Sequence, residues 1–243
     1  MTNKIALITG ANKGIGFETA RQLGALGVTI LVGARDEIRG AAATTALRDQ
    51  GVDAHFVELD VTDKSTHSRA AQYIEANFGK LDILINNAGV SLERGVPASQ
   101  TNTELWRATF ETNVFALIDL TNALLPLIKK SEAGRIVNLS SILASLTLNS
   151  NPDSPIAGSV PYNTAYNASK AALNMFTVHL ATELKNTNIK VNAAHPGWVK
   201  TDMGGEEAPM ELVDGAKTSV ALATLPEDGP TGGYFHMGKT LPW

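Results

Sequence analysis

The sequence contains no cysteine among its 243 residues. Disulfide bonds, zinc sites built on thiolates and cysteine nucleophiles are therefore excluded. The five histidines do not follow the spacing that is typical of metal ligands, so we expect no catalytic metal. These histidines are His55, His67, His179, His195 and His236.

Clusters of positive charge and long apolar segments are also missing. No basic run is longer than Lys129-Lys130 and the formal net charge is -4, so nucleic acid and anionic membranes are not expected as partners. No apolar run approaches the roughly 20 residues of a membrane span. The first ten residues, MTNKIALITG, lack the apolar core of a signal peptide. We expect a soluble, cytoplasmic protein.

What the chain does contain is an alternation of apolar, β-rich runs with longer helical stretches. Hydrophobic residues make up 44% of it, enough for one large core, and we expect a single domain over residues 1–243. The runs KIALIT (4–9) and LDILINN (81–87) are apolar throughout, which is typical of strands buried on both faces. Helices between such strands predict an α/β, doubly wound Rossmann fold, with a parallel sheet of about seven strands and helices on both faces.

The first predicted strand is followed by the glycine-rich stretch TGANKGIG, residues 9–16. Gly10, Gly14 and Gly16 permit positive φ values and close approach of a ligand to the backbone. The next helix presents free N–H groups and the positive end of its dipole, which favour phosphate. The spacing G-x-x-x-G-x-G differs from the common G-x-G-x-x-G pattern. Three glycines at a strand-to-helix junction nevertheless favour nucleotide binding over a simple tight turn.

From Lys4 to about Met203 the chain resembles the short-chain dehydrogenase/reductase (SDR) family. The resemblance depends on seven short motifs, which are specific because of their order along one chain. The resemblance implies an oxidoreductase that uses a nicotinamide dinucleotide. The motifs are TGANKGIG (9–16), LDV (59–61), NNAG (86–89), TNV (112–114), NLSS (138–141), YNASK (166–170) and HPGWVKTDM (195–203).

The end of the second predicted strand indicates which dinucleotide binds. In a Rossmann fold, an acidic residue there binds the ribose hydroxyls of NAD and repels the 2′-phosphate of NADP. In the SDR pattern this position is Ala34, followed by Arg35, and Lys13 adds a cation in the glycine loop. A guanidinium suits phosphate, so we expect NADP(H). Asp36 is the opposing residue, since a shift of one position would bring it to the ribose.

The resemblance also implies the other cofactor contacts. The LDV motif would flank the adenine, the NNAG motif would lie beside its ribose, and residues 196–201 would cover the nicotinamide end. The apolar members of this set could equally belong to the core. The full predicted set is Gly10, Asn12, Lys13, Gly14, Ile15, Gly16, Arg35, Asp60, Val61, Asn87, Ala88, Gly89, Tyr166, Lys170, Pro196, Gly197, Val199 and Thr201.

A candidate catalytic pair lies on the predicted helix of residues 165–185. Tyr166 and Lys170 are four residues apart and therefore share one helix face. The pKa of a free tyrosine is about 10, and a nearby ammonium lowers it. This suits Tyr166 to act as a general acid when a carbonyl is reduced, or as a base when an alcohol is oxidised. The cofactor supplies the hydride.

The resemblance implies two further catalytic residues. Ser141 would hydrogen-bond and polarise the substrate carbonyl. Ser140 is the competing choice, because successive strand residues point to opposite faces and only one can face the site. Asn113 would hold a water in a proton relay from Lys170 towards solvent, and the alternative is a helix residue bonded to its own backbone.

The interval between Ser141 and Tyr166 departs from the usual family pattern. The two residues are 25 positions apart, which is longer than the common SDR spacing and resembles the carbonyl-reductase branch. In many SDRs the helix that carries the tyrosine packs against a second subunit. An insert beside that helix would block this packing, so a monomer is favoured over a homodimer or tetramer.

The substrate pocket is expected to combine this insert with residues 90–96 and a substrate loop at about 197–215. Leu143, Tyr162 and Trp198 are the candidate lining residues, and apolar walls predict a hydrophobic ketone or aldehyde. Residues 232–243 are expected to form the last strand and close over the pocket.

The sequence therefore predicts an NADPH-dependent carbonyl reductase that acts on a small molecule. The alternatives are an NADP-dependent alcohol or steroid dehydrogenase, a 3-oxoacyl reductase, and a non-catalytic NADP(H) sensor. The fold alone does not exclude a sensor. A sensor would be expected to have lost Tyr166 or Lys170, and both are present.

Overall fold

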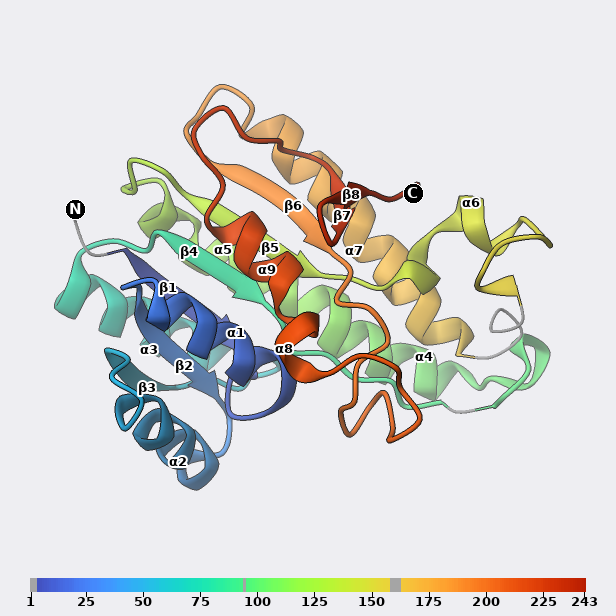
Figure 1. The fold of residues 1–243 in the computed structure, drawn as a ribbon, viewed down its shortest axis with the longest axis horizontal. Coiled ribbons are helices and arrows are strands. Elements are labelled where there is room, and N and C mark those ends of the chain that lie inside the picture. The colour runs from blue at the N-terminus through green and yellow to red at the C-terminus, as the bar shows by residue number, and fades with distance from the viewer. Residues whose placement is uncertain (1–3, 94, 158–162) are drawn as a thin grey trace.

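The computed structural model describes residues 4–93, 95–157 and 163–243. Its centre is an eight-stranded sheet in the order β3-β2-β1-β4-β5-β6-β7-β8 (Figure 1). Every neighbouring pair is parallel except β7 and β8, which form a short antiparallel hairpin. The strands are β1 (Ile5–Thr9), β2 (Thr29–Ala34), β3 (Ala54–Glu58), β4 (Ile83–Asn86), β5 (Arg135–Leu139), β6 (Lys190–Ala194), β7 (Tyr234–His236) and β8 (Lys239–Thr240).

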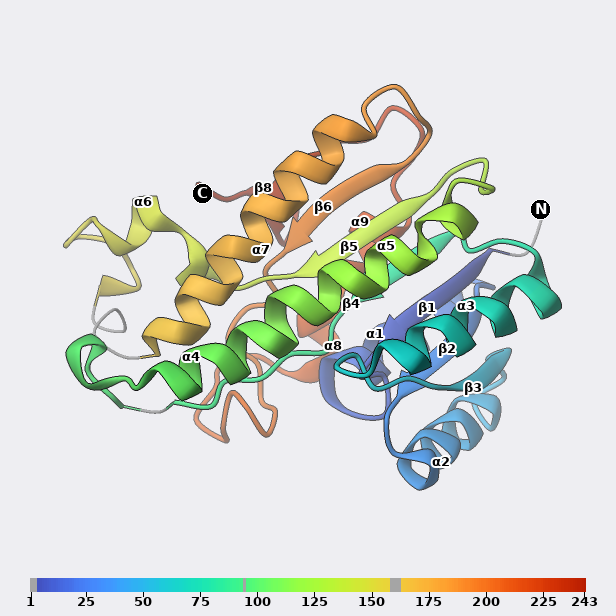
Figure 2. The same cartoon turned by 180° about the vertical axis from the view of Figure 1, so that it is seen from behind.

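Helices cover both faces of this sheet. One face, in front in Figure 1, carries α1 (Gly14–Ala25), α2 (Glu37–Arg48), α8 (Leu212–Gly215) and α9 (Lys217–Ala223). The other face, in front in Figure 2, carries α3 (Lys64–Phe78), α4 (Thr103–Phe110), α5 (Ala116–Ile128) and α7 (Thr164–Glu183). The shorter elements are η1 (Ala98–Gln100), η2 (Glu111–Phe115), η3 (Ile142–Ala144) and α6 (Leu146–Asn149).

The predicted doubly wound Rossmann fold is confirmed. The predicted count of about seven strands differs only by the two-residue strand β8, which is exposed and too short to produce an apolar run in the sequence. The order of strands reverses between β1 and β4. In open α/β sheets, ligands bind at such a switch point, beside the carboxyl ends of the strands.

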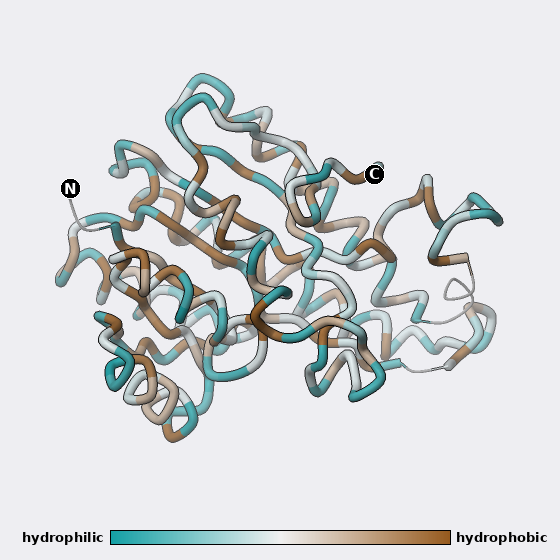
Figure 3. The backbone as a smooth tube through the Cα atoms, in the orientation of Figure 1, coloured by the Kyte–Doolittle hydropathy of each residue, from teal (hydrophilic) through white to brown (hydrophobic). Residues whose placement is uncertain are grey.

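Each face of the sheet has its own apolar core. Leu84 of β4 packs with Leu124 of α5 on one face, and Ile8 of β1 packs with Leu23 of α1 on the other. Burial of each such side chain contributes about 1.5–3 kcal/mol. Figure 3 shows the same pattern, with hydrophobic colour along the central strands and hydrophilic colour in the outer loops.

The helix predicted from residue 104 onward contains an irregular turn. Helices α4 and α5 are joined by η2, a π-helical turn, and the three form one stretch, Thr103–Ile128, of 26 residues. By length and composition this stretch could span a membrane, which the sequence analysis did not anticipate. Half of its most apolar window is buried inside the protein, as expected of a core helix. π turns often occur at functional sites, and this one carries Asn113.

Candidate active site

The glycine loop lies at the carboxyl end of β1 and has the geometry that its sequence predicts. Gly10 and Gly14 have φ values of 65° and 58°, which glycine adopts without strain. A Cβ at Gly16 would lie 2.5 Å from Nδ2 of Asn87 and 2.6 Å from the carbonyl oxygen of Gly10. Only glycine therefore fits at position 16. The Asn87 Nδ2 donates to the carbonyl oxygen of Thr9 at 2.7 Å, so Asn87 braces the glycine loop.

The start of α1 leaves backbone donors for a bound anion. Lys13 is the N-cap residue but its side chain does not cap the helix, and the first turn contains no acidic residue. Free N–H groups at a helix N-terminus bind phosphate readily. Together with the positive-φ glycines, these groups form a cradle that fits the pyrophosphate of a dinucleotide.

The loop after β6 reaches the glycine loop. The Lys13 Nζ lies 2.6 Å from Oδ2 of Asp202, and both side chains are exposed. A Cβ placed on Gly14 would be 3.8 Å from the methyl carbon of Thr201. The predicted cofactor residues of these two loops, about 190 positions apart in the chain, are therefore neighbours in space.

The residues at the end of β2 distinguish the two dinucleotides. Ala34 is buried and Arg35 is exposed. The Oδ1 of Asp36 accepts the backbone N–H of Arg39 at 2.9 Å, so Asp36 caps α2. Asp36 thus takes part in a helix cap and Lys13 is paired with Asp202, and the assignment of Arg35 and Lys13 to a 2′-phosphate stays a prediction.

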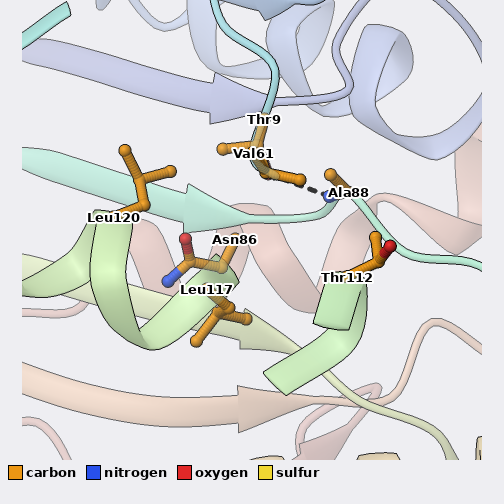
Figure 4. Close-up of a pocket in the computed structure, with 7 residues that line it drawn as sticks. All are labelled: Thr9, Val61, Asn86, Ala88, Thr112, Leu117 and Leu120. Carbon is orange, nitrogen blue, oxygen red and sulfur yellow. Dashed lines mark hydrogen bonds between the residues drawn. The ribbon is translucent and has the colours of Figure 1, made fainter. Parts of the chain in front are cut away.

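A small pocket lies beneath the NNAG turn (Figure 4). The Thr9 hydroxyl oxygen accepts the backbone N–H of Ala88 at 2.8 Å, the bond drawn in the figure. Val61 and Ala88, which were predicted to lie beside the adenine and its ribose, both line this pocket. The lining residues are Thr9, Val61, Asn86, Ala88, Thr112, Leu117 and Leu120.

The predicted catalytic side chains meet at the carboxyl end of β5. Lys170 is 4% exposed, its Nζ donates to the carbonyl oxygen of Leu139 at 2.8 Å, and it lies 5.8 Å from the ring centroid of Tyr166. Ser141 lies close enough to Tyr166 for its side chain to act on the pKa of the phenol. The Ser140 hydroxyl instead donates to Oδ1 of Asn174 at 2.7 Å, towards α7 and the interior. Of the two serines, Ser141 is thus the one beside Tyr166.

The electrostatics of this pair differ from the expectation. Burial raises the pKa of Tyr166, and the hydrogen bond to Ser141 opposes this rise only in part. The predicted lowering by the Lys170 ammonium is wrong for this structure, because that group is directed at the Leu139 carbonyl and desolvation dominates. Burial also lowers the pKa of Lys170 from 10.5 to about 8. A phenol with a raised pKa stays protonated at neutral pH, as a proton donor must.

Asn113 lies in the π turn and is fully buried. Its Oδ1 accepts the N–H of Val90 at 2.8 Å, and its Nδ2 donates to the carbonyl oxygen of Val90 at 2.9 Å. Nδ2 also donates to the hydroxyl of Ser169 at 3.0 Å. The side chain therefore holds the loop after β4 rather than its own helix backbone. The predicted water relay stays a prediction.

The remaining predicted residues occupy the loops around this centre. Trp198 is exposed and its Nε1 donates to the carbonyl oxygen of Gly204 at 2.8 Å. Leu143 is half-buried, and its carbonyl oxygen accepts Nδ2 of Asn149 at 2.8 Å. Tyr162 lies outside the described residues. That these three side chains share one substrate pocket stays a prediction.

Among the histidines, His195 has a defined role. Its Nδ1 accepts the N–H groups of Ile142 at 3.2 Å and Gly197 at 3.4 Å, which ties the end of β6 to the loop of Ser141. Burial, aided by the neighbouring His236, lowers its pKa to about 3, so the ring is neutral. In the part of the chain that the structure describes, no three His, Asp or Glu residues are grouped as metal ligands.

Comparison with known proteins agrees with this geometry. Residues 4–212 match the family model for short chain dehydrogenases. The chain belongs to the short-chain dehydrogenase/reductase family. This SDR is 32% identical to the Bos taurus protein named carbonyl reductase (NADPH) 1, covering 100% of this chain and 99% of that protein. It is 33% identical to (+)-neomenthol dehydrogenase of Capsicum annuum, covering 97% and 96%.

A solved structure gives the same result for the fold. The SDR superimposes with a TM-score of 0.87 on the NADPH-bound carbonyl reductase from chicken fatty liver, at 27% identity and over the whole of both chains. The predicted membership of a carbonyl-reductase-like branch is confirmed.

Sequence reasoning missed one residue of this site. Glu93 is 1% exposed and its carboxylate binds the first turn of α7, which carries Tyr166. The only signal in the sequence was its position within the loop expected to line the pocket. An acidic residue in a loop is ordinarily a solvated surface charge, and its partner is far away in the chain.

Proposed function

We propose that this SDR reduces a hydrophobic ketone or aldehyde to an alcohol with NADPH. The observation that carries the proposal is the cluster of Ser141, Tyr166 and Lys170 at the carboxyl end of β5, on the same edge of the sheet as the glycine loop after β1. The names of the similar proteins support it, since they include NADPH-dependent carbonyl reductases. When bound, NADPH supplies the hydride.

The protein's own residues supply position and the proton. The N–H groups at the start of α1 hold the pyrophosphate, while Lys13 and Arg35 bind the 2′-phosphate. Ser141 donates a hydrogen bond to the substrate carbonyl oxygen, and Tyr166 donates the proton that this oxygen needs as it becomes a hydroxyl. The buried Lys170 keeps a positive charge close to the oxygen as negative charge develops there.

The raised pKa of Tyr166 favours the reducing direction. Oxidation of an alcohol requires the phenolate as a base, and burial disfavours that charged form. Reduction requires the protonated phenol, which is the form present at neutral pH. The direction of the pKa shift thus agrees with the proposed carbonyl reduction, and oxidation would need a higher pH.

Substitution of the proton donor tests this mechanism. We expect Tyr166→Phe to lower kcat by roughly 10²- to 10⁴-fold, the range typical of general acid catalysis, and to leave the Kd for NADPH nearly unchanged. NADPH oxidation is followed by the nicotinamide absorbance, with aryl ketones, quinones, cyclic terpenoid ketones and aldehydes as substrates. Tyr73→Phe on α3, outside the site, is the matched control.

Two results would contradict the proposal. A near-normal kcat in Tyr166→Phe would show that another group donates the proton. Tight NADPH binding without turnover of any substrate in the wild-type protein would favour a sensor of NADP(H).

We also propose that the protein is a monomer, because the insert between Ser141 and Tyr166 adjoins the start of α7. Static light scattering should then report a mass near 25.7 kDa. A mass of two or four times that value would mean that the insert does not block subunit packing.

A further inference from the structure

The first turn of α7 is capped by a residue from a distant part of the chain. The Glu93 Oε1 accepts the backbone N–H of Ala165 at 2.5 Å and that of Tyr166 at 3.3 Å. These N–H groups have no partner within the helix. The N-cap residue, Asn163, has a φ of 66° and makes no capping bond with its side chain. Glu93 therefore provides, from 73 positions away in the sequence, the capping hydrogen bond that a local side chain usually provides.

The carbonyl group of Tyr166 is held as well. The Ser169 hydroxyl donates to the Tyr166 carbonyl oxygen at 2.7 Å and accepts from the Nδ2 of Asn113. Asn113 also binds Val90 at both its N–H and its carbonyl. The segment of residues 90–93 is thus connected to the Tyr166 backbone at two points, through Asn113 at one end and through Glu93 at the other.

We propose that Glu93 is a positioning residue, which fixes the Tyr166 hydroxyl for proton transfer by holding the first turn of α7. The proposal rests on the proposed reductase function. Proton transfer depends steeply on distance, and a displacement of about 1 Å is sufficient for a loss of roughly a hundredfold in rate. An anchor on the backbone of Tyr166 therefore affects the rate of proton transfer.

The alternative is a cap that serves stability alone, and the surroundings of Glu93 argue against it. The other carboxylate Oε2 is buried and has no hydrogen-bond partner among the described residues. Burial of such an oxygen is unfavourable. Caps on α2 and α3 come instead from the local, exposed residues Asp36 and Asp63. A stability cap would be expected to follow that pattern.

Three variants test the proposal. Glu93→Ala removes the anchor, Glu93→Gln keeps one oxygen acceptor, and Asp63→Ala removes a cap on a helix that carries no catalytic residue. For each we would measure kcat, the KM for the carbonyl substrate, the Kd for NADPH by fluorescence, and the solvent deuterium isotope effect on kcat. Hydrogen exchange of residues 163–175 reports the order of the first turn of α7 independently of activity.

For Glu93→Ala we expect kcat to fall by roughly 10- to 100-fold, with NADPH binding within about twofold of wild type. The solvent isotope effect should increase, because proton transfer becomes slower relative to the other steps. Glu93→Gln should recover most of the lost kcat, and Asp63→Ala should lose about 1 kcal/mol of stability but keep kcat and the isotope effect.

The proposal is overturned if Glu93→Ala keeps its kcat while the wild type is active. It is also overturned if kcat falls without a change in the isotope effect, as a smaller folded fraction would cause, or if Glu93→Gln is as slow as Glu93→Ala. An inactive wild-type protein would instead count against the reductase function itself. Faster hydrogen exchange in Glu93→Ala would then still test whether Glu93 orders the turn.

Discussion

We expect the buried ammonium of Lys170 to reduce the stability of the folded protein. Burial lowers its pKa from 10.5 to about 8, and one pKa unit corresponds to about 1.4 kcal/mol. Keeping this ammonium charged inside the folded protein therefore costs about 3 kcal/mol at pH 7. Lys170→Met removes the charge and keeps a side chain of similar length. Its loss of the bond to Leu139 offsets about 1 kcal/mol of the gain, so we expect a net stabilisation of about 2 kcal/mol.

The pH dependence of this stability difference shows whether burial of the Lys170 charge is its cause. Below pH 8 the lysine is charged in both the folded and the unfolded protein, and the penalty is fully present. Between about pH 8 and 10.5 the folded protein releases its proton first, so the unfolded state binds more protons and wild-type stability rises with pH. The advantage of Lys170→Met should therefore shrink by about 2 kcal/mol between pH 7 and pH 10.

Urea unfolding of wild type and Lys170→Met at these two pH values measures both quantities. Lys129→Met, at an exposed lysine at the end of α5, is the matched control and should change the free energy of unfolding by less than about 0.5 kcal/mol. The reasoning would be refuted by a Lys170→Met protein no more stable than wild type at pH 7. It would be refuted equally by a gain of the same size at pH 10. The variant should lack reductase activity at both.

Two further predictions concern the cofactor and the substrate loop. Arg35→Ala should raise the KM for NADPH by roughly 10- to 100-fold, as expected for loss of a charged hydrogen bond. The KM for NADH should stay unchanged. Equal effects on the two KM values would contradict a role of Arg35 at the 2′-phosphate. Trp243 stacks on Tyr234 with centroids 5.4 Å apart, and its carbonyl oxygen accepts the N–H of Thr147 at 3.0 Å, beside the proposed pocket. Trp243→Ala should raise the KM for the carbonyl substrate by roughly 3- to 10-fold, while the Kd for NADPH should stay unchanged. An unchanged KM for the substrate would show that the stacking of Trp243 on Tyr234 does not shape the pocket.

Local patterns explain why the fold and much of the site were predictable. The continuous apolar runs of β1 and β4 are typical of strands buried on both faces, and the glycines after β1 permit the positive φ values that the structure shows. Tyr166 and Lys170 share a helix face because of helical periodicity alone. The choice of Ser141 over Ser140 as the catalytic serine stays a prediction, because the alternation along a strand shows only that the two side chains point to opposite faces. The packing of Asn174 shows which of them faces the interior.

The sequence by itself determined the order of strands and helices, the glycine turn after β1 and the shared helix face of Tyr166 and Lys170, because each depends on residues within a few positions of one another. Tertiary structure decided what depends on burial and on distant partners. That Asp36 caps a helix depended on the start of α2. The direction of the Tyr166 pKa shift depended on desolvation, which no residue pattern measures. The bond from Glu93 to the turn that carries Tyr166 exists only because the folded sheet brings the loop after β4 beside the start of α7.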